Sequence, residues 1–156
     1  MTNSSPCTAP GCRIRTAVPG DCERIALLAT QLGYPSNTDE IRRRIADMED
    51  RRQFVIYVAE APHREVIGWI GAYVFRSVEI DKLAEISGLV VEQAARCQGV
   101  GAKLLLAAEE WARATGCPLI SVRSNIVRER AHQFYVRHNY VLTKVQKTFI
   151  KRLDRA

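Results

Sequence analysis

The first part of the chain shows apolar residues first at strand-like and then at helix-like spacings. A short strand is expected over residues 13–17, and apolar residues three or four positions apart then predict a first helix that ends at Gly33. Asn37 is a good N-cap residue, and Glu40 stands three positions later, as in a capping box. We therefore expect a second helix after Asn37, with only one side buried.

The rest of the chain is rich in β-branched and aromatic runs. Two such runs, 54–60 and 66–75, are separated by Ala61-Pro62-His63-Arg64 and predict an antiparallel hairpin. Further elements follow the same patterns. We expect a strand over 83–91, a helix from Gly99 to about Thr115, a parallel strand around 119–122, a helix from Arg130 to Arg137, and final strands near 141–145 and 148–153.

The junction at Gly99 is the most informative stretch. An apolar strand, 86–91, passes through a short polar loop into a helix opened by Gly99 and Gly101. Glycine lets the backbone approach a ligand closely, and the first amides of a helix lack intrahelical partners. Such a turn can bind phosphate. Leu104 stands where a dinucleotide or Walker loop would need another glycine, so both are excluded. Taken alone, the two glycines also fit a plain connector.

The spacing Arg96-x-x-Gly99-x-Gly101 between that strand and helix resembles the signature of the GNAT superfamily of N-acyltransferases. The order of expected elements from about Arg13 to Leu153 is similar to that family too. The resemblance implies an α/β (α+β) fold in one domain. Its sheet would be mixed and mostly antiparallel, with a splayed central parallel pair and about four flanking helices.

The resemblance also implies acetyl-CoA as cosubstrate. In the family, the loop cradles the pyrophosphate of coenzyme A, and main-chain groups of the preceding strand hold pantetheine, where Gly88 would permit a bulge. The cofactor-binding residues expected on this basis are Leu89, Val90, Val91, Arg96, Cys97, Gln98, Gly99, Val100, Gly101 and Ala102.

Two residues are candidates for catalysis. An amine with a pKa near ~10 is mostly protonated at pH 7, so acyl transfer needs a proton acceptor. Glu85 resembles the base of the histone acetyltransferase branch, although it could equally be a solvated carboxylate at a strand end, with a water chain as base. Tyr135, in RAHQFYVRHNY, resembles the family's general acid. The alternative for Tyr135 is an aromatic residue packed in the core.

Two further residues are assigned more loosely. Asn125 follows the expected strand 119–122 and either binds the cofactor or caps a turn. Tyr34 lies in the loop between the first two helices, which meets the acceptor in GNAT proteins, so we expect it to contact the substrate.

Composition narrows the function classes. With 156 residues and 47% hydrophobic content, one domain is expected over residues 13–156, after a disordered tail over 1–12. The absence of a long apolar run or a signal peptide predicts a cytoplasmic protein with no membrane contact. The five cysteines, Cys7, Cys12, Cys22, Cys97 and Cys117, lack zinc-ligand spacing, so no metal is expected.

Together these features predict an N-acetyltransferase that transfers an acetyl group from acetyl-CoA to a primary amine by direct attack in a ternary complex. The acceptor could be a small molecule or a protein or peptide amine. A noncatalytic acyl-CoA-sensing module is an alternative. A nucleic-acid-binding protein is a weaker one, because the net charge of +6 comes from scattered residues. Exposed edges of the final strands would be compatible with a homodimer.

Overall fold

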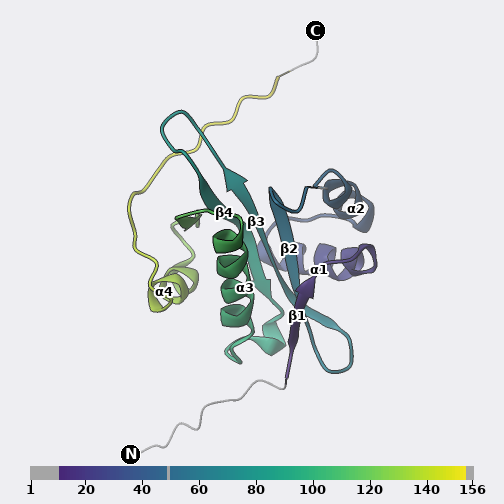
Figure 1. The fold of residues 1–156 in the computed structure, drawn as a ribbon. Coiled ribbons are helices and arrows are strands. Elements are labelled where there is room, and N and C mark those ends of the chain that lie inside the picture. The colour runs from purple at the N-terminus through teal and green to yellow at the C-terminus, as the bar shows by residue number, and fades with distance from the viewer. Residues whose placement is uncertain (1–10, 49, 154–156) are drawn as a thin grey trace, which may run out of the picture. The chain divides into compact units, whose positions relative to one another are not determined.

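The computed structural model describes residues 11–48 and 50–153 (Figure 1). The predicted tail over residues 1–12 lies almost entirely outside them. The elements, in chain order, are β1 (Arg13–Thr16), η1 (Pro19–Asp21), α1 (Cys22–Leu32), α2 (Thr38–Ala46), β2 (Phe54–Glu60), β3 (Val66–Phe75), β4 (Leu83–Val91), η2 (Gln93–Ala95), α3 (Val100–Ala114), β5 (Ile120–Val122) and α4 (Glu129–Arg137).

Five strands form one sheet in the order β1-β2-β3-β4-β5. The first three pairings are antiparallel, and β4 pairs with β5 in parallel. α3 connects the two parallel strands, as a parallel pair requires a long crossover. The predicted mixed, mostly antiparallel sheet with one parallel pair is confirmed, and so is the number of α-helices; the pair includes β5, which is the edge strand of the described sheet because the expected final strands are not formed.

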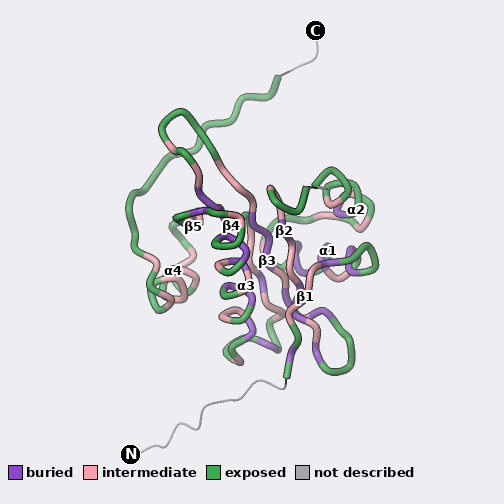
Figure 2. Tube along the Cα trace, in the orientation of Figure 1, coloured by how far each residue is buried: buried purple, intermediate pink, exposed green. Residues whose placement is uncertain are grey.

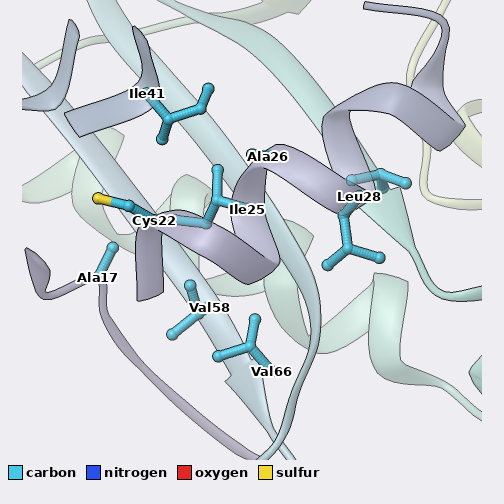
Figure 3. Close-up of a cluster of buried hydrophobic side chains, with 9 residues drawn as sticks. Ala17, Cys22, Ile25, Ala26, Leu28, Ile41, Val58 and Val66 are labelled. Carbon is cyan, nitrogen blue, oxygen red and sulfur yellow. The ribbon is translucent and has the colours of Figure 1, made fainter. Parts of the chain in front are cut away.

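One sheet face carries α1 and α2. The apolar stripe of α1 enters a core built from α1, α2, β2, β3 and β4 (Figure 3). Leu28 and Val58 are fully buried there, and Trp69 packs against the same cluster. The predicted capping box is present at α2, where the Asn37 side chain accepts from the Glu40 amide at 2.9 Å. Within α2, Ile41 is the buried residue, so the helix is buried on one side as expected.

α3 covers the opposite face. A Cβ added to Gly68 would meet the Leu104 side chain at 3.2 Å, whereas its neighbour Trp69 faces the α1 core. Successive residues of a strand point to opposite faces, so α1 and α3 enclose the sheet from two sides. Leu104, Leu105 and Trp111 of α3 are buried, and the Trp111 indole donates to the Arg51 carbonyl at 3.0 Å.

Residues 124–156 form a separate compact unit, of which positions up to 153 are described. It contains α4, within one residue of its predicted bounds, but residues 141–153 form no strand, so the predicted strands near 141–145 and 148–153 are wrong. Their apolar side chains are exposed along this segment (Figure 2). These residues have the side chains typical of a strand, but a strand also needs a neighbouring backbone to pair with. The homodimer prediction, which used those strand edges, therefore loses its basis.

Within the described residues, no helix combines the length and apolar content needed to cross a bilayer.

Candidate active site

The parallel pairing of β4 with β5 is short. Ala84, Glu85 and Ile86 pair with Ile120, Ser121 and Val122, and no later residue of β4 has a partner in β5. From Ser87 to Val91, β4 is bonded on its β3 side alone within the described part of the chain. Residues 87–91 consequently have no strand partner on their other side within the described residues, as expected for a splayed pair.

A β-bulge lies where the two strands separate. Gly71 of β3 pairs with Gly88 while the next residue, Ala72, pairs with Ile86, so Ser87 is the extra residue. The expected bulge is therefore found next to Gly88. The glycine has its own packing reason, because a Cβ at Gly88 would approach the Trp69 ring at 2.8 Å.

After β4, the chain turns sharply into α3. The Arg96 Nε donates to the Val91 carbonyl at 3.0 Å, and Nε2 of the Gln98 side chain donates to the Ala94 carbonyl at 3.1 Å, so both side chains hold the loop to its own backbone. Cys97 and Gly99 both have positive φ, 62° and 79°. Glycine adopts such a φ at little cost, whereas Cys97 is strained. No atom lies within 4 Å of a Cβ built on Gly99, so the space beside it is open.

The N-terminus of α3 has free donors. No side chain caps it. Within the described residues, the first backbone amide of the helix that donates to a helix carbonyl is that of Lys103, at 3.1 Å from the carbonyl of the N-cap residue Gly99. The amides of Val100, Gly101 and Ala102 precede that bond. They stand at the positive end of a 15-residue helix. This arrangement suits an anion such as phosphate.

The side chains of the other predicted cofactor residues divide into two groups. Val90 and Val100 are buried in the core, so they can offer a ligand only their main-chain groups. Leu89, Val91 and Gln98 are half-buried, and Arg96 and Cys97 are exposed.

Glu85 lies inside β4 and is buried, so the alternative of a solvated strand-end carboxylate is wrong. Its Oε1 accepts a hydrogen bond from Arg123 Nε at 2.6 Å and also contacts Nη2 of the same guanidinium. Arg123 Nη2 donates to the Tyr73 hydroxyl at 3.1 Å. Burial, together with the Glu85 carboxylate, raises the pKa of Tyr73. These three residues, called the β4 cluster below, form a connected polar group.

The β4 cluster is a product of sheet register. Glu85 pairs with Tyr73 on one side and with Ser121 on the other. Arg123 stands two residues after Ser121, and directly after the last β4–β5 pair. Phe54 pairs with Tyr73 and stacks on it, with ring centroids 6.5 Å apart. Tyr73 and Arg123 were not predicted as site residues, since only the register between distant strands places them beside Glu85.

Tyr135 lies in α4, in the unit that begins at Ser124. Its ring contacts Phe134 and Tyr140, with centroids 5.3 and 5.4 Å away. Burial raises the pKa of Tyr135 to about 12, despite the opposing charge of Arg128. The phenol therefore keeps its proton throughout the neutral range. The aromatic contacts and the retained proton fit both interpretations of this residue, packing and catalysis.

Asn125 and Tyr34 have simple local environments. The Asn125 Oδ1 accepts from the Val127 amide at 3.2 Å, and its carbonyl accepts from the Arg128 amide at 3.0 Å. These bonds are those of a turn cap. Tyr34 lies in the loop between α1 and α2 and is 66% exposed, so its ring is accessible to a ligand. Across residues 11–48 and 50–153, no three His, Cys, Asp or Glu side chains gather as a metal site.

Sheet topology, the splayed β4–β5 pair and the loop before α3 together define an acetyltransferase fold, and sequence comparison agrees. The model of the Acetyltransferase (GNAT) family matches residues 22–140. The chain belongs to this family.

Individual proteins of known name or structure are also similar to this chain. The chain is 32% identical over 137 residues to the aminoalkylphosphonate N-acetyltransferase of Salmonella typhimurium, which covers 84% of this chain and 86% of that protein. Among solved structures, glucosamine-6-phosphate N-acetyltransferase from Arabidopsis thaliana superposes with a TM-score of 0.77 at 17% identity, over 90% of this chain and 98% of that one. A transcriptional regulator from Bacillus halodurans gives 0.79 at 22%, over 90% and 100%. These two structures share the fold.

Proposed function

We propose that this protein transfers the acetyl group of acetyl-CoA to the primary amine of a small molecule. The observation that carries the proposal is the junction of β4 and α3. There a splayed strand with free main-chain groups leads into a helix N-terminus with free amides and open space beside Gly99. This junction offers main-chain donors along the strand and an anion cradle at its end. Those are the two requirements for holding pantetheine and a pyrophosphate.

The residues that hold the cosubstrate would be those predicted from the sequence, with one refinement. Main-chain groups of Leu89, Val90 and Val91 would bind the pantetheine arm, and the amides from Gln98 to Ala102 would bind phosphate oxygens. Because Arg96 Nε is engaged with the Val91 carbonyl, Arg96 would both shape the loop and present the rest of its guanidinium to the phosphates. Asn125 remains a cofactor candidate, alongside its turn-capping bonds.

For the chemistry, acetyl-CoA supplies a thioester, whose acetyl group passes to the amine and whose sulfur needs a proton. Glu85, or a water molecule ordered by it, accepts a proton from the amine. Tyr135 holds a proton that its raised pKa keeps in place near neutrality, and it donates that proton to the departing sulfur. The mechanism requires no cysteine nucleophile.

The acceptor we propose is an aminoalkylphosphonate. The name of the relative from Salmonella typhimurium supports this class, at 32% identity over most of both chains. Tyr34, exposed between α1 and α2, would lie against the acceptor.

The direct test is steady-state acetylation of a panel of amines by the full chain with acetyl-CoA. The panel contains aminoalkylphosphonates, simple alkylamines, polyamines, aminoglycosides and lysine peptides. Turnover highest with the aminoalkylphosphonates supports the proposal, and turnover confined to lysine peptides would contradict a small-molecule acceptor. A protein that binds coenzyme A and acetylates no amine would instead be a sensing module.

Cofactor binding is tested separately. Coenzyme A at ~100 times its dissociation constant should stabilise the fold by about 2.7 kcal/mol, measured as a thermal shift. Gly101→Val should weaken this binding, because a branched side chain intrudes where the backbone meets phosphate. Ala114→Val, at the exposed far end of α3, controls for the helix cost of valine. Equal coenzyme A affinity in both variants would place the cradle elsewhere.

A further inference from the structure

Glu85 and Arg123 form an ion pair whose two side chains differ greatly in solvent exposure. The Glu85 side chain is 11% exposed, whereas that of Arg123 is 72% exposed. A buried carboxylate needs a partner, and here its partner stands almost entirely in solvent. The β4 cluster thus places a negative charge in the sheet and a positive charge above it, on the face that carries α1.

The guanidinium of Arg123 has unused donors. It has five N–H groups in a fixed fork. Nε and Nη2 serve Glu85, and Nη2 also serves the Tyr73 hydroxyl. Nη1 makes no hydrogen bond to any part of the chain that the structure describes. Its two N–H groups are therefore free for an anion, and the arginine fork matches the oxygens of a carboxylate or phosphate group.

The pair stands where the parallel strands separate. Glu85 belongs to the last three paired residues of β4, and Arg123 directly follows the last paired residue of β5. The free backbone of β4 begins two residues after Glu85, at Ser87. An acceptor bound at the pair would thus lie next to the strand segment proposed to hold pantetheine.

We propose that Glu85 and Arg123 together recognise an acceptor carrying both charges, with the ammonium group at Glu85 and a phosphonate or phosphate at Arg123. This rests on the proposed function. The two side chains touch, so the charges of the acceptor must be separated by only a short alkyl chain. Arg123 would repel a polycation such as an aminoglycoside, and a simple alkylamine would satisfy only Glu85. The same residue thus attracts one class of amine and discriminates against another.

A purely structural role for the pair makes a different prediction. A structural arginine would affect every substrate equally, through stability or the position of Glu85. A recognition residue affects acceptors that carry an anion more than acceptors that carry none.

The test compares the wild type with Arg123→Gln and Arg123→Lys, using 2-aminoethylphosphonate and propylamine as acceptors. Arg113→Gln is the matched control, because Arg113 is 66% exposed, is paired with Glu109, and lies outside the site. Arg123→Gln should lower kcat/KM for the phosphonate by about 10- to 100-fold, mainly through KM, as expected for a lost charge-assisted hydrogen bond. Propylamine should lose clearly less, and its loss should lie in kcat, because Arg123 acts on an acceptor without an anion only through Glu85. Arg123→Lys should recover part of the loss, and the control should behave as wild type.

Failure of the recognition role and failure of the proposed function give different results. Equal losses for both acceptors in the Arg123 variants, or a wild-type preference for propylamine, would overturn the recognition role while leaving acetyl transfer intact. No acetylation of any amine by the wild type would overturn the proposed function. Calorimetric titration with 2-aminoethylphosphonate then decides the inference by itself. Binding that Arg123→Gln weakens and Arg113→Gln does not would support it, and absence of binding, or equal binding in both variants, would refute it.

Discussion

Two arginine–carboxylate clusters on the same sheet differ in how completely their donors are used. In the first, called the β1 cluster, Arg15 joins Asp21 and Glu60. Both side chains of the Arg15–Asp21 pair are largely covered, at 21% and 8% exposure. In the β4 cluster, Arg123 covers Glu85 but is itself 72% exposed. Both clusters pair an arginine with a buried carboxylate, but the exposure of the arginine differs.

In the β1 cluster, every nitrogen of the Arg15 guanidinium donates a hydrogen bond to the chain. Arg15 Nε donates to Glu60 at 2.8 Å, and Nη1 and Nη2 donate to the two Asp21 oxygens at 2.7 and 2.9 Å. Asp21 also accepts from the Val18 amide at 2.8 Å. Although burial opposes it, this bonding holds the pKa of Asp21 below its usual range. These bonds join β1, β2 and the start of α1, so the cluster serves the fold.

The comparison shows that the role of an ion pair depends on whether any of its hydrogen-bond donors remain exposed and unpaired. A closed pair contributes stability, and breaking it leaves a buried charge unpaired. A pair with a free, exposed donor edge gains less from burial and can exchange partners with a ligand. Variants of the two clusters should therefore affect different observables.

The largest effect is expected on stability, from Asp21→Asn. This change leaves Arg15 without its bidentate partner, which should cost about 3 kcal/mol and lower Tm by roughly 6 to 12 °C. Thermal unfolding followed by circular dichroism measures it. Activity of the folded protein should be retained. A Tm within about 2 °C of wild type would remove the distinction between the two clusters.

Glu85→Gln should show the opposite pattern. If Glu85 is the base, turnover should fall by about a hundredfold, the usual scale of general-base assistance. Arg123 would lose its partner but stay solvated, so Tm should change by only a few degrees. Glu109→Gln, which removes the carboxylate of the Arg113 pair, is the control. Near-wild-type turnover of this variant across the pH range would show that Glu85 is not the base and that water serves instead.

Tyr135→Phe tests a residue outside both clusters. Its effect on turnover can be compared with the effects of the variants in the two clusters. The ring and its contacts with Phe134 and Tyr140 remain, and only the proton is lost. Turnover should fall at least tenfold, about 1.4 kcal/mol, while acetyl-CoA binding and Tm stay close to wild type. Single-turnover and binding measurements separate the two effects. Unchanged turnover would return Tyr135 to a packing role.

Tyr73→Phe should have a smaller effect on the β4 cluster. It removes the hydroxyl that accepts from Arg123 Nη2 but leaves both bonds to Glu85. A net hydrogen-bond contribution of about 0.5 to 1.5 kcal/mol corresponds to a two- to tenfold loss in kcat/KM for an aminoalkylphosphonate. A loss as large as that of Arg123→Gln would make Tyr73 the primary contact.

The smallest effect is a pH dependence of the β1 cluster. The folded pKa of Asp21 is lowered, so its contribution to stability is present above its unfolded pKa of about 4 and is lost as pH falls through the folded value. The Tm difference between wild type and Asp21→Asn should therefore shrink below about pH 4. A difference that grows on acidification would have the wrong sign for this linkage.

Local features of the sequence determined much of the fold. The Asn37–Glu40 capping box, the bounds of α3 and α4, the hairpin and the glycine-opened loop were all predictable, because each depends on residues close together in the chain. Glu85 was also a candidate from the sequence, through its resemblance to the base of the histone acetyltransferase branch.

Tertiary structure decided the rest. Tyr73, Glu85 and Arg123 are brought together by strand register, with the bulge at Ser87 shifting one strand against the next. No local pattern encodes that alignment, since one residue of slip moves every side chain to the other face. The failed strands over 141–153 show the same limit. Their sequence has β character, but a strand exists only where another backbone accepts its hydrogen bonds, and that partner is a property of the fold.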